Sequence, residues 1–389
     1  MTEITGRDVI AGLAETYYQL YVRPGGEDSE RQYKEIVTSG EEPAERSLAH
    51  FTLDERDRLT VEETPAGEIC VITLYNRKDF ETFMKIMASK CRDVPIPPTQ
   101  GASFLNGVIN WRKIEAHEEE FFRTELLKGN EDPDWDSEFK RFISVKENFK
   151  DALIVLSVGP YSQVEASRAA ALTERLGTDA KEAFCGRDNK NAGQESLQDR
   201  WLSLSDSIRR VHECTHFICR KLYPDKIGEV WDELVADSAG VYAAFGSYIP
   251  EMVELFLGIG PAPGEACGKD ESSAPDEACG KDESSALDEA CGKDESSMPD
   301  EACAAGDKEK EHAYVYTGGR LENYVKGDET VISLGPVKAE FAPTASREER
   351  LDILAGKVHT VLEGFRKTAR ECEGIPPFEF ALRLEELHG

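Results

Sequence analysis

Basic residues are scarce in this 389-residue chain. It has 46 lysines and arginines against 76 aspartates and glutamates, which gives a formal net charge of −30 at pH 7. Such a charge repels the phosphates of nucleic acids and the surface of anionic membranes, and the sequence has no basic stripe to overcome the repulsion. We therefore expect neither nucleic acid nor a membrane as a partner.

A secretory leader and long hydrophobic runs are missing as well. The first residues, MTEITGRDVIAGLAETYYQL, contain early acids and lack the basic start and continuous apolar core of a signal peptide. No later run approaches the roughly 20 apolar residues of a membrane-spanning helix. The sequence predicts a soluble, cytoplasmic protein, and its oligomeric state stays open.

Cysteine spacings typical of a disulfide-rich domain are also absent. Of the ten cysteines, four lie in a tandem repeat and the other six are scattered. In a cytoplasmic protein such cysteines are expected to be free thiols.

The repeat begins at Glu265 and has a period of 12 residues: EACGKDESSAPD, EACGKDESSALD, EACGKDESSMPD and a truncated EAC. Each copy carries four acids and one lysine and almost no large apolar side chains. Such a segment cannot bury enough surface to offset the entropy of ordering. Residues 261–311 are predicted to be a disordered acidic insertion, and their cysteines are too far apart for a closed zinc site.

The rest of the chain predicts an α+β protein, because short β-branched runs alternate with helical periodicity. The expected strands are 68–76 and 151–159, and the expected helices are 78–91, 167–177, 196–222 and 347–371, while 93–107 is expected to be a loop and 312–325 a strand, a turn and a helix. The expected regions are an N-terminal α+β region (1–150), a catalytic region (151–260), the insertion (261–311) and a mainly helical C-terminal region (312–389).

Two of the seven histidines, His212 and His216, lie one helical turn apart in RRVHECTHFICRKLYPDKIGEVWDELVAD, residues 209–237. Apolar residues recur there at steps of three and four, the period of an amphipathic helix. Two imidazoles at i and i+4 can reach one ion from the same side of a helix, and Glu213 lies beside that ion without having to bind it. The spacing predicts a zinc site with Glu213 as its candidate base.

A second predicted helix follows a break at residues 224–225. If the two helices form an antiparallel hairpin, Glu233 lies level with His216 and Asp237 lies level with His212, because the members of each pair are equidistant from the turn. Glu233 is thus expected to be the third zinc ligand, and Asp237 is expected to accept a hydrogen bond from His212.

The pair of motifs HECTH (212–216) and ELVAD (233–237) resembles that of the gluzincin metallopeptidases, in which His-Glu-x-x-His precedes Glu-x-x-x-Asp. The resemblance covers residues 203–246. It implies a zincin-like helix hairpin with His212, His216 and Glu233 as zinc ligands, Glu213 as general base and Asp237 as the residue that orients His212.

The expected function is therefore a zinc-dependent metallopeptidase that acts on a peptide or protein, by endo- or exopeptidase cleavage. Zinc lowers the pKa of a bound water to about 7, and Glu213 takes the proton of that water as it attacks the peptide carbonyl. A further side chain is expected to stabilise the oxyanion. The candidates that the sequence offers for this role are Tyr242, His312, Tyr314, Tyr316, Arg320 and His359.

One alternative interpretation involves no catalysis. The same hairpin could hold zinc in a catalytically silent protein-interaction module, or it could be an ordinary buried helix pair without metal. The glutamate after the first histidine favours the enzyme, because a structural zinc site does not need a base at that position.

Overall fold

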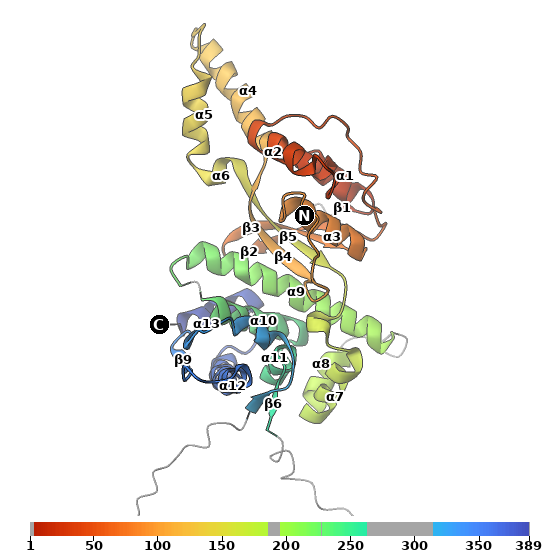
Figure 1. Cartoon of the computed structure of the whole chain (residues 1–389), viewed down its shortest axis with the longest axis vertical. Helices are drawn as coiled ribbons and strands as arrows, with labels where there is room; N and C mark the ends of the chain where they lie inside the picture. The colour runs from red at the N-terminus through yellow and green to blue at the C-terminus, as the bar shows by residue number, and fades with distance from the viewer. Residues whose placement is uncertain (1–3, 186–194, 227, 263–313, 389) are drawn as a thin grey trace, which may run out of the picture.

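The computed structural model describes residues 4–185, 195–226, 228–262 and 314–388. The long helix α9 (Leu197–Leu222) runs through the middle of the molecule (Figure 1). A β-sheet with its own helices lies on one side of α9, and a mainly helical half lies on the other side. The expected α+β class is confirmed.

The sheet has five strands in the order β1-β2-β3-β5-β4. The two predicted strands, 68–76 and 151–159, correspond to β3 (Gly67–Leu74) and β5 (Lys150–Ser157) at its centre. These two strands run parallel, and the other neighbours are antiparallel. The outer strands are β1 (Ile4–Thr5), β2 (Arg58–Thr64) and β4 (Ala102–Ile109). The sequence predicts a boundary between two regions after residue 150. Strand β5 lies after that residue and pairs with β3 and β4, which lie before it, so the boundary falls inside one sheet.

The prediction of a loop over 93–107 is wrong from Ala102 onward. Strand β4 begins there and forms an edge of the sheet. Its pairing with β5 shifts between Asn106 and Val108, and Gly107 lies at that irregularity with a φ of +89°. Positive φ is typical of glycine both in turns and in β-bulges, so the glycine that indicated a turn instead lies in a bulge within the strand.

The two faces of the sheet pack against different helices. Leu153 and Val155 of β5 pack against α1 (Asp8–Ala14) and α3 (Arg77–Met87), whereas Ile154 and Leu156 pack against α9. This alternation follows from the pleat of a strand. The sheet therefore fixes the position of the middle of α9.

On its other side α9 packs against α10 (Glu229–Phe245), and the two helices run antiparallel as the sequence predicted. They come very close at Gly240, where a Cβ would lie only 2.7 Å from the carbonyl oxygen of Ile208. Only glycine allows the backbones to come so close. The same core includes α12 (Arg347–Glu371), a predicted helix that begins with a capping box between Ser346 and Glu349.

The C-terminal residues return to this core through a short pair of strands. Residue Pro261 of β6 (Ile259–Pro261) pairs with Tyr314 of β7 (Tyr314–Tyr316), so the two described ends of the repeat segment lie side by side (Figure 1). From residue 263 to 311, the predicted disordered insertion lies outside the described residues. The predicted strand and turn within 312–325 correspond to β7 and a 3₁₀-helix, Arg320–Tyr324.

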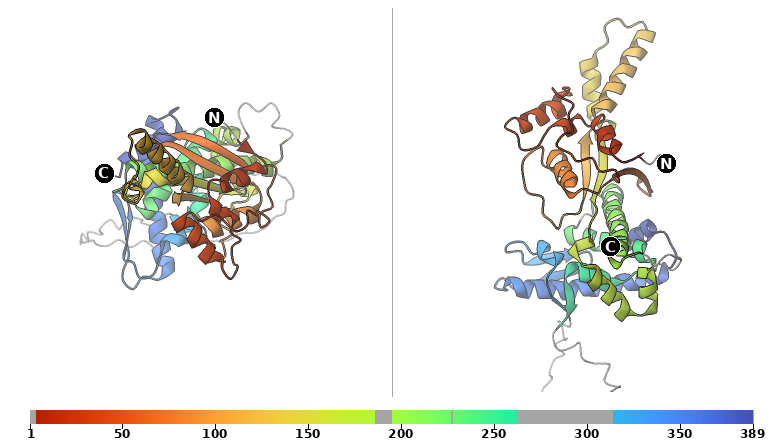
Figure 2. Two further views of the ribbon diagram at one scale, coloured as in Figure 1. Left: turned by 90° about the horizontal axis from the view of Figure 1, so that it is seen from above. Right: turned by 90° about the vertical axis from the view of Figure 1, so that its right-hand side faces the viewer.

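The helices α4 (Trp111–Leu127) and α5 (Trp135–Ile143) form a hairpin that projects from the sheet, away from the rest of the molecule (Figure 2). The remaining elements are α2 (Ser29–Ser39), α6 (Lys146–Phe149), α7 (Ala166–Leu176), α8 (Thr178–Cys185), α11 (Pro250–Leu257), α13 (Pro377–Glu386), β8 (Val331–Leu334), β9 (Val337–Glu340) and the 3₁₀-helices Tyr18–Tyr21 and Tyr161–Gln163.

None of the described helices combines the length and apolar composition of a membrane span. The six cysteines within the described ranges are free thiols, as predicted.

Candidate metal centre

The two histidines of the HECTH motif lie on the side of α9 that faces α10. Their Nε2 atoms are 3.0 Å apart. Glu233 of α10 completes the group, because its Oε2 lies 3.6 Å from Nε2 of His212 and its Oε1 lies 3.3 Å from Nε2 of His216. Across the described ranges, no other histidines, cysteines and carboxylates form a group of three or more that could share an ion.

These separations fit the coordination that zinc prefers. Zinc binds imidazole nitrogen at about 2.0–2.1 Å in a tetrahedral arrangement, which places neighbouring donor atoms about 3.3–3.4 Å apart. The two Nε2 atoms are 3.0 Å apart, and each ring has one oxygen of the Glu233 carboxylate nearby, Oε2 at 3.6 Å from His212 and Oε1 at 3.3 Å from His216, so the distances are close to that value. His212, His216 and Glu233 can thus occupy three corners of a zinc tetrahedron, and the fourth corner remains for another ligand.

The contact expected between Asp237 and His212 is present. Oδ1 of Asp237 lies 2.9 Å from Nδ1 of His212, and the carboxylate is completely buried. A carboxylate there accepts the Nδ1 proton, which leaves the lone pair of Nε2 directed at the ion. The orientation and the tautomer of His212 are therefore both suited to metal binding.

Sequence reasoning missed Tyr161, which completes this contact. Its hydroxyl donates to Oδ1 of Asp237 at 2.6 Å and lies 2.9 Å from Nδ1 of His212. Burial is the main cause that raises the pKa of Tyr161 well above its usual value, so the hydroxyl remains a neutral donor. The next two residues, Ser162 and Gln163, have φ values of +52° and +59°, a conformation that non-glycine residues rarely adopt. This uncommon turn directly follows Tyr161, whose ring lies edge-on to the His212 ring.

Of the six candidate oxyanion donors, the structure brings Arg320 to the cluster. Its Nη2 forms an ion pair with Oδ2 of Asp237, while Nε is buried without a hydrogen-bond partner. The other described candidates are engaged elsewhere: Tyr242 with the carbonyls of Cys372 and Ile375, Tyr316 with Gly319, and Tyr314 stacked on His359, which contacts Glu254. His312 lies outside the described residues.

The charges around Glu233 keep it ionised. Burial alone would raise its pKa, but the hydrogen bond from His216 and the electrostatic influence of His216, His212 and Arg320 outweigh burial and lower the pKa far below its usual value. Conversely, burial alone would lower the pKa of His216, but Glu233 and Glu213 outweigh it and raise that pKa to about 9. Without an ion, His216 therefore holds a proton that a metal must displace.

Glu213 lies in the wall of a cavity of about 310 Å³ that is also lined by the three candidate ligands and Arg320. Its side chain is buried, with the residue only 8% exposed. Among the described residues, no hydrogen bond or ion pair engages its carboxylate, in contrast to Glu233 and Asp237. The carboxylate is thus free to accept a proton from a molecule in the cavity.

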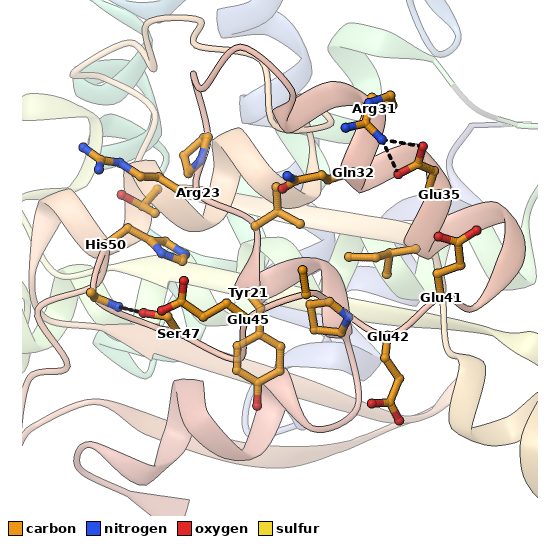
Figure 3. A pocket seen from close by; sticks show the side chains of 17 residues that line it. Tyr21, Arg23, Arg31, Gln32, Glu35, Glu41, Glu42, Glu45, Ser47 and His50 are labelled. Carbon is orange, nitrogen blue, oxygen red and sulfur yellow. Dashed lines mark hydrogen bonds and ion pairs between the residues drawn. The ribbon is translucent and has the colours of Figure 1, made fainter.

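A larger cavity, of about 840 Å³, lies elsewhere, under the segment that follows α2. Its labelled side chains do not converge on one point (Figure 3). Arg31 is paired with Glu35, and the ring of His50 is hydrogen-bonded to the carbonyl of Leu20. We therefore place the chemistry at the smaller cavity, where donor atoms do converge.

Replacing Asp237 by asparagine is expected to weaken zinc binding by about 10- to 100-fold, because the buried charge that orients His212 is lost while all three ligands remain. Competition with a chelator of known affinity measures the change. The matched control is Tyr161→Phe, which removes one hydrogen bond to the same carboxylate but keeps its charge, and should weaken binding less. Wild-type affinity in Asp237→Asn would contradict the role assigned to this carboxylate.

A family described as a family of unknown function, DUF7005, matches residues 6–177 and 189–265, well over half of the chain. The matched ranges include the three candidate ligands, Glu213, Asp237 and Tyr161, whereas Arg320 lies beyond them. No curated protein and no solved structure matches the chain.

Proposed function

The chain belongs to the DUF7005 family, whose function is unknown, and from its metal cluster we propose that it is a zinc-dependent metallopeptidase. The observation that carries the proposal is the combination of three converging donor side chains with an unengaged carboxylate, Glu213, in one cavity. A purely structural zinc site is normally closed by four protein ligands and needs no base. The three-ligand set and Glu213 therefore favour an enzyme over a catalytically silent module.

The residues of the cavity have separate roles in this proposal. His212, His216 and Glu233 would hold the ion, and zinc, when bound, would supply an acidified water and polarise the substrate carbonyl. Glu213 accepts the proton of the attacking water and passes it to the leaving amine. Arg320, which lines the cavity beside the candidate ligands, is the cation that we assign to stabilise negative charge on the carbonyl oxygen.

The edge of the sheet supports a peptide as the substrate. Gly101, Ala102 and Phe104, at the start of β4, line the same cavity. The amide of Ser157 donates to the carbonyl of Gly101 at 2.8 Å, so Gly101 and Ser157 form a hydrogen-bonded pair. In an antiparallel pair of strands the next residue points its backbone groups to the opposite side. The amide and carbonyl of Ala102 therefore face away from β5. No other described strand pairs with that edge. An extended peptide could therefore add to β4 through main-chain hydrogen bonds and lie beside the metal cluster.

Metal removal tests the proposal directly. Treatment with a chelator is expected to abolish cleavage of a mixed peptide library by the purified protein, and added zinc is expected to restore it. Metal analysis must include iron and manganese, because two histidines and one carboxylate also form iron sites. Cleavage that survives complete metal removal, or a protein that cleaves no peptide with zinc bound, would contradict the proposal.

A further inference from the structure

A second cavity adjoins the one at the metal cluster. It has a volume of about 780 Å³ and is lined by strands of the sheet, by the end of α9 and by residues at the base of the α4–α5 hairpin. Phe104 and Arg220 line both cavities, and the guanidinium of Arg220 lies over the Phe104 ring, 5.4 Å from its centre. We call the two cavities together the β4 groove, because residues of β4 line both.

The β4 groove is rich in cations, although the chain as a whole has a charge of −30. Its lysines and arginines are Lys113, Lys146, Lys150, Arg209, Arg220, Lys221 and Arg320. Lys113 is paired with Asp151, and Arg320 is paired with Asp237. The other five form no ion pair with any carboxylate of the described residues. The acids that line the groove are Glu68, Glu147, Asp151, Glu213 and Glu233.

Arg209 is the cation most deeply embedded in the groove. The residue is 4% exposed, and its Nη2 donates to the carbonyls of Gly159 and Pro160 at 3.2 and 3.3 Å. A Cβ at Gly101 would lie 2.9 Å from its Nε, so the guanidinium lies directly against the backbone that leads into β4. Its Nη1 is buried without a hydrogen-bond partner. Asp206 and Glu213 favour the charge of Arg209, but neither forms an ion pair with it, so a further anion nearby would still stabilise the buried guanidinium.

We infer that the ligand of the β4 groove, and hence the substrate of the proposed peptidase, is an acidic peptide. The inference rests on the proposed function for the cleavage step only. The unpaired cations can form ion pairs with the glutamate and aspartate side chains of a bound peptide. The free edge of β4 can form hydrogen bonds with the main chain of the same peptide. A net charge of −30 would otherwise repel an acidic chain, so the local cations determine where such a chain can bind.

A single-stranded nucleic acid is the other polyanion that such a groove could accept. It is disfavoured because a phosphate backbone does not use the hydrogen-bonding pattern of a strand edge. An oligonucleotide of similar length therefore belongs in the test, with the peptide expected to bind more tightly.

Fluorescence anisotropy of labelled dodecapeptides provides the measurement. Three peptides differ only in carrying glutamate, glutamine or lysine at alternate positions, and they are titrated with the full chain bearing Glu213→Gln, so that binding is read without cleavage. The glutamate peptide is expected to bind at least about 10-fold more tightly than its glutamine counterpart at low salt. The difference should shrink as salt rises from about 0.05 to 0.5 M, because exposed charges are screened.

Substitutions of lysines test whether the groove causes the preference for the glutamate peptide. Combining Lys146→Gln, Lys150→Gln and Lys221→Gln is expected to reduce the preference for glutamate over glutamine by at least about 5-fold. The matched control combines Lys140→Gln, Lys181→Gln and Lys338→Gln, exposed lysines outside the groove, and should retain the preference.

Three outcomes would overturn the inference: equal binding of the glutamate and glutamine peptides, equal loss of preference in the control, or tighter binding of the oligonucleotide. None of them bears on zinc content or on cleavage of a neutral peptide, which test the proposed function. A protein that prefers the glutamate peptide but neither binds zinc nor cleaves it would overturn the proposed function and leave the anion preference of the groove intact.

Discussion

Replacing His216 by alanine is expected to reduce bound zinc from about one ion per chain to less than about 0.1, because two remaining donors cannot hold the ion against solvent. The measurement is elemental analysis of protein purified without chelators and incubated with zinc. His216 has a side chain that is 11% exposed and lies at the wall of the cavity, so its truncation removes a ligand without opening the core.

The matched control for this change is His117→Ala. His117 lies on the projecting hairpin, where it contacts Glu138 and stacks on Phe142, far from α9. That variant should keep its full zinc content. Undiminished zinc in His216→Ala, or a wild-type protein that takes up no metal, would show that the cluster is not a metal site.

Replacing Glu213 by glutamine is expected to slow peptide cleavage by roughly 10²- to 10⁴-fold while zinc stays bound. Glutamine has nearly the same shape as glutamate, but its amide cannot accept the proton that the mechanism assigns to this side chain. Because Glu213 is not among the three converging donors, its loss should not remove the ion. The paired measurements are kcat on a cleaved peptide and zinc content of the same preparation.

Glu229→Gln is the control for Glu213→Gln. Glu229 is an exposed residue in the first turn of α10, paired with Lys326, and it does not line the cavity. Both activity and zinc should be unchanged there. If Glu213→Gln cleaves peptides as fast as the wild type with zinc retained, Glu213 is not the base, and the silent zinc-binding module becomes the better interpretation.

The candidate ligands could be predicted because they depend on local geometry. The i, i+4 spacing of His212 and His216 follows from one helical turn, and the levels of Glu233 and Asp237 follow from a short connection between two antiparallel helices. Such relations extend over few residues and need no knowledge of the rest of the fold.

The remainder of the site depends on packing between distant segments. Tyr161 reaches His212 across 51 positions of the sequence, and Arg320 reaches Asp237 across 83. No periodicity connects such residues, so Arg320 was one of six equal candidates and Tyr161 was missed. Strand β4, hidden by its bulge glycine, was missed for a related reason: its pairing with β5 depends on residues 150–157, on the far side of the α4–α5 hairpin.

The pairing of β6 with β7 has a topological consequence for the candidate metal centre. Any break in the chain between residues 262 and 314 would leave two polypeptides, one with the ligands and Asp237 and the other with Arg320, α12 and α13. Both would still contribute to one hydrophobic core, which contains Trp231 and Val241 from the first piece and Leu354 and Phe365 from the second. The arginine that neutralises Asp237 would then be supplied in trans, and the centre would become that of a non-covalent heterodimer.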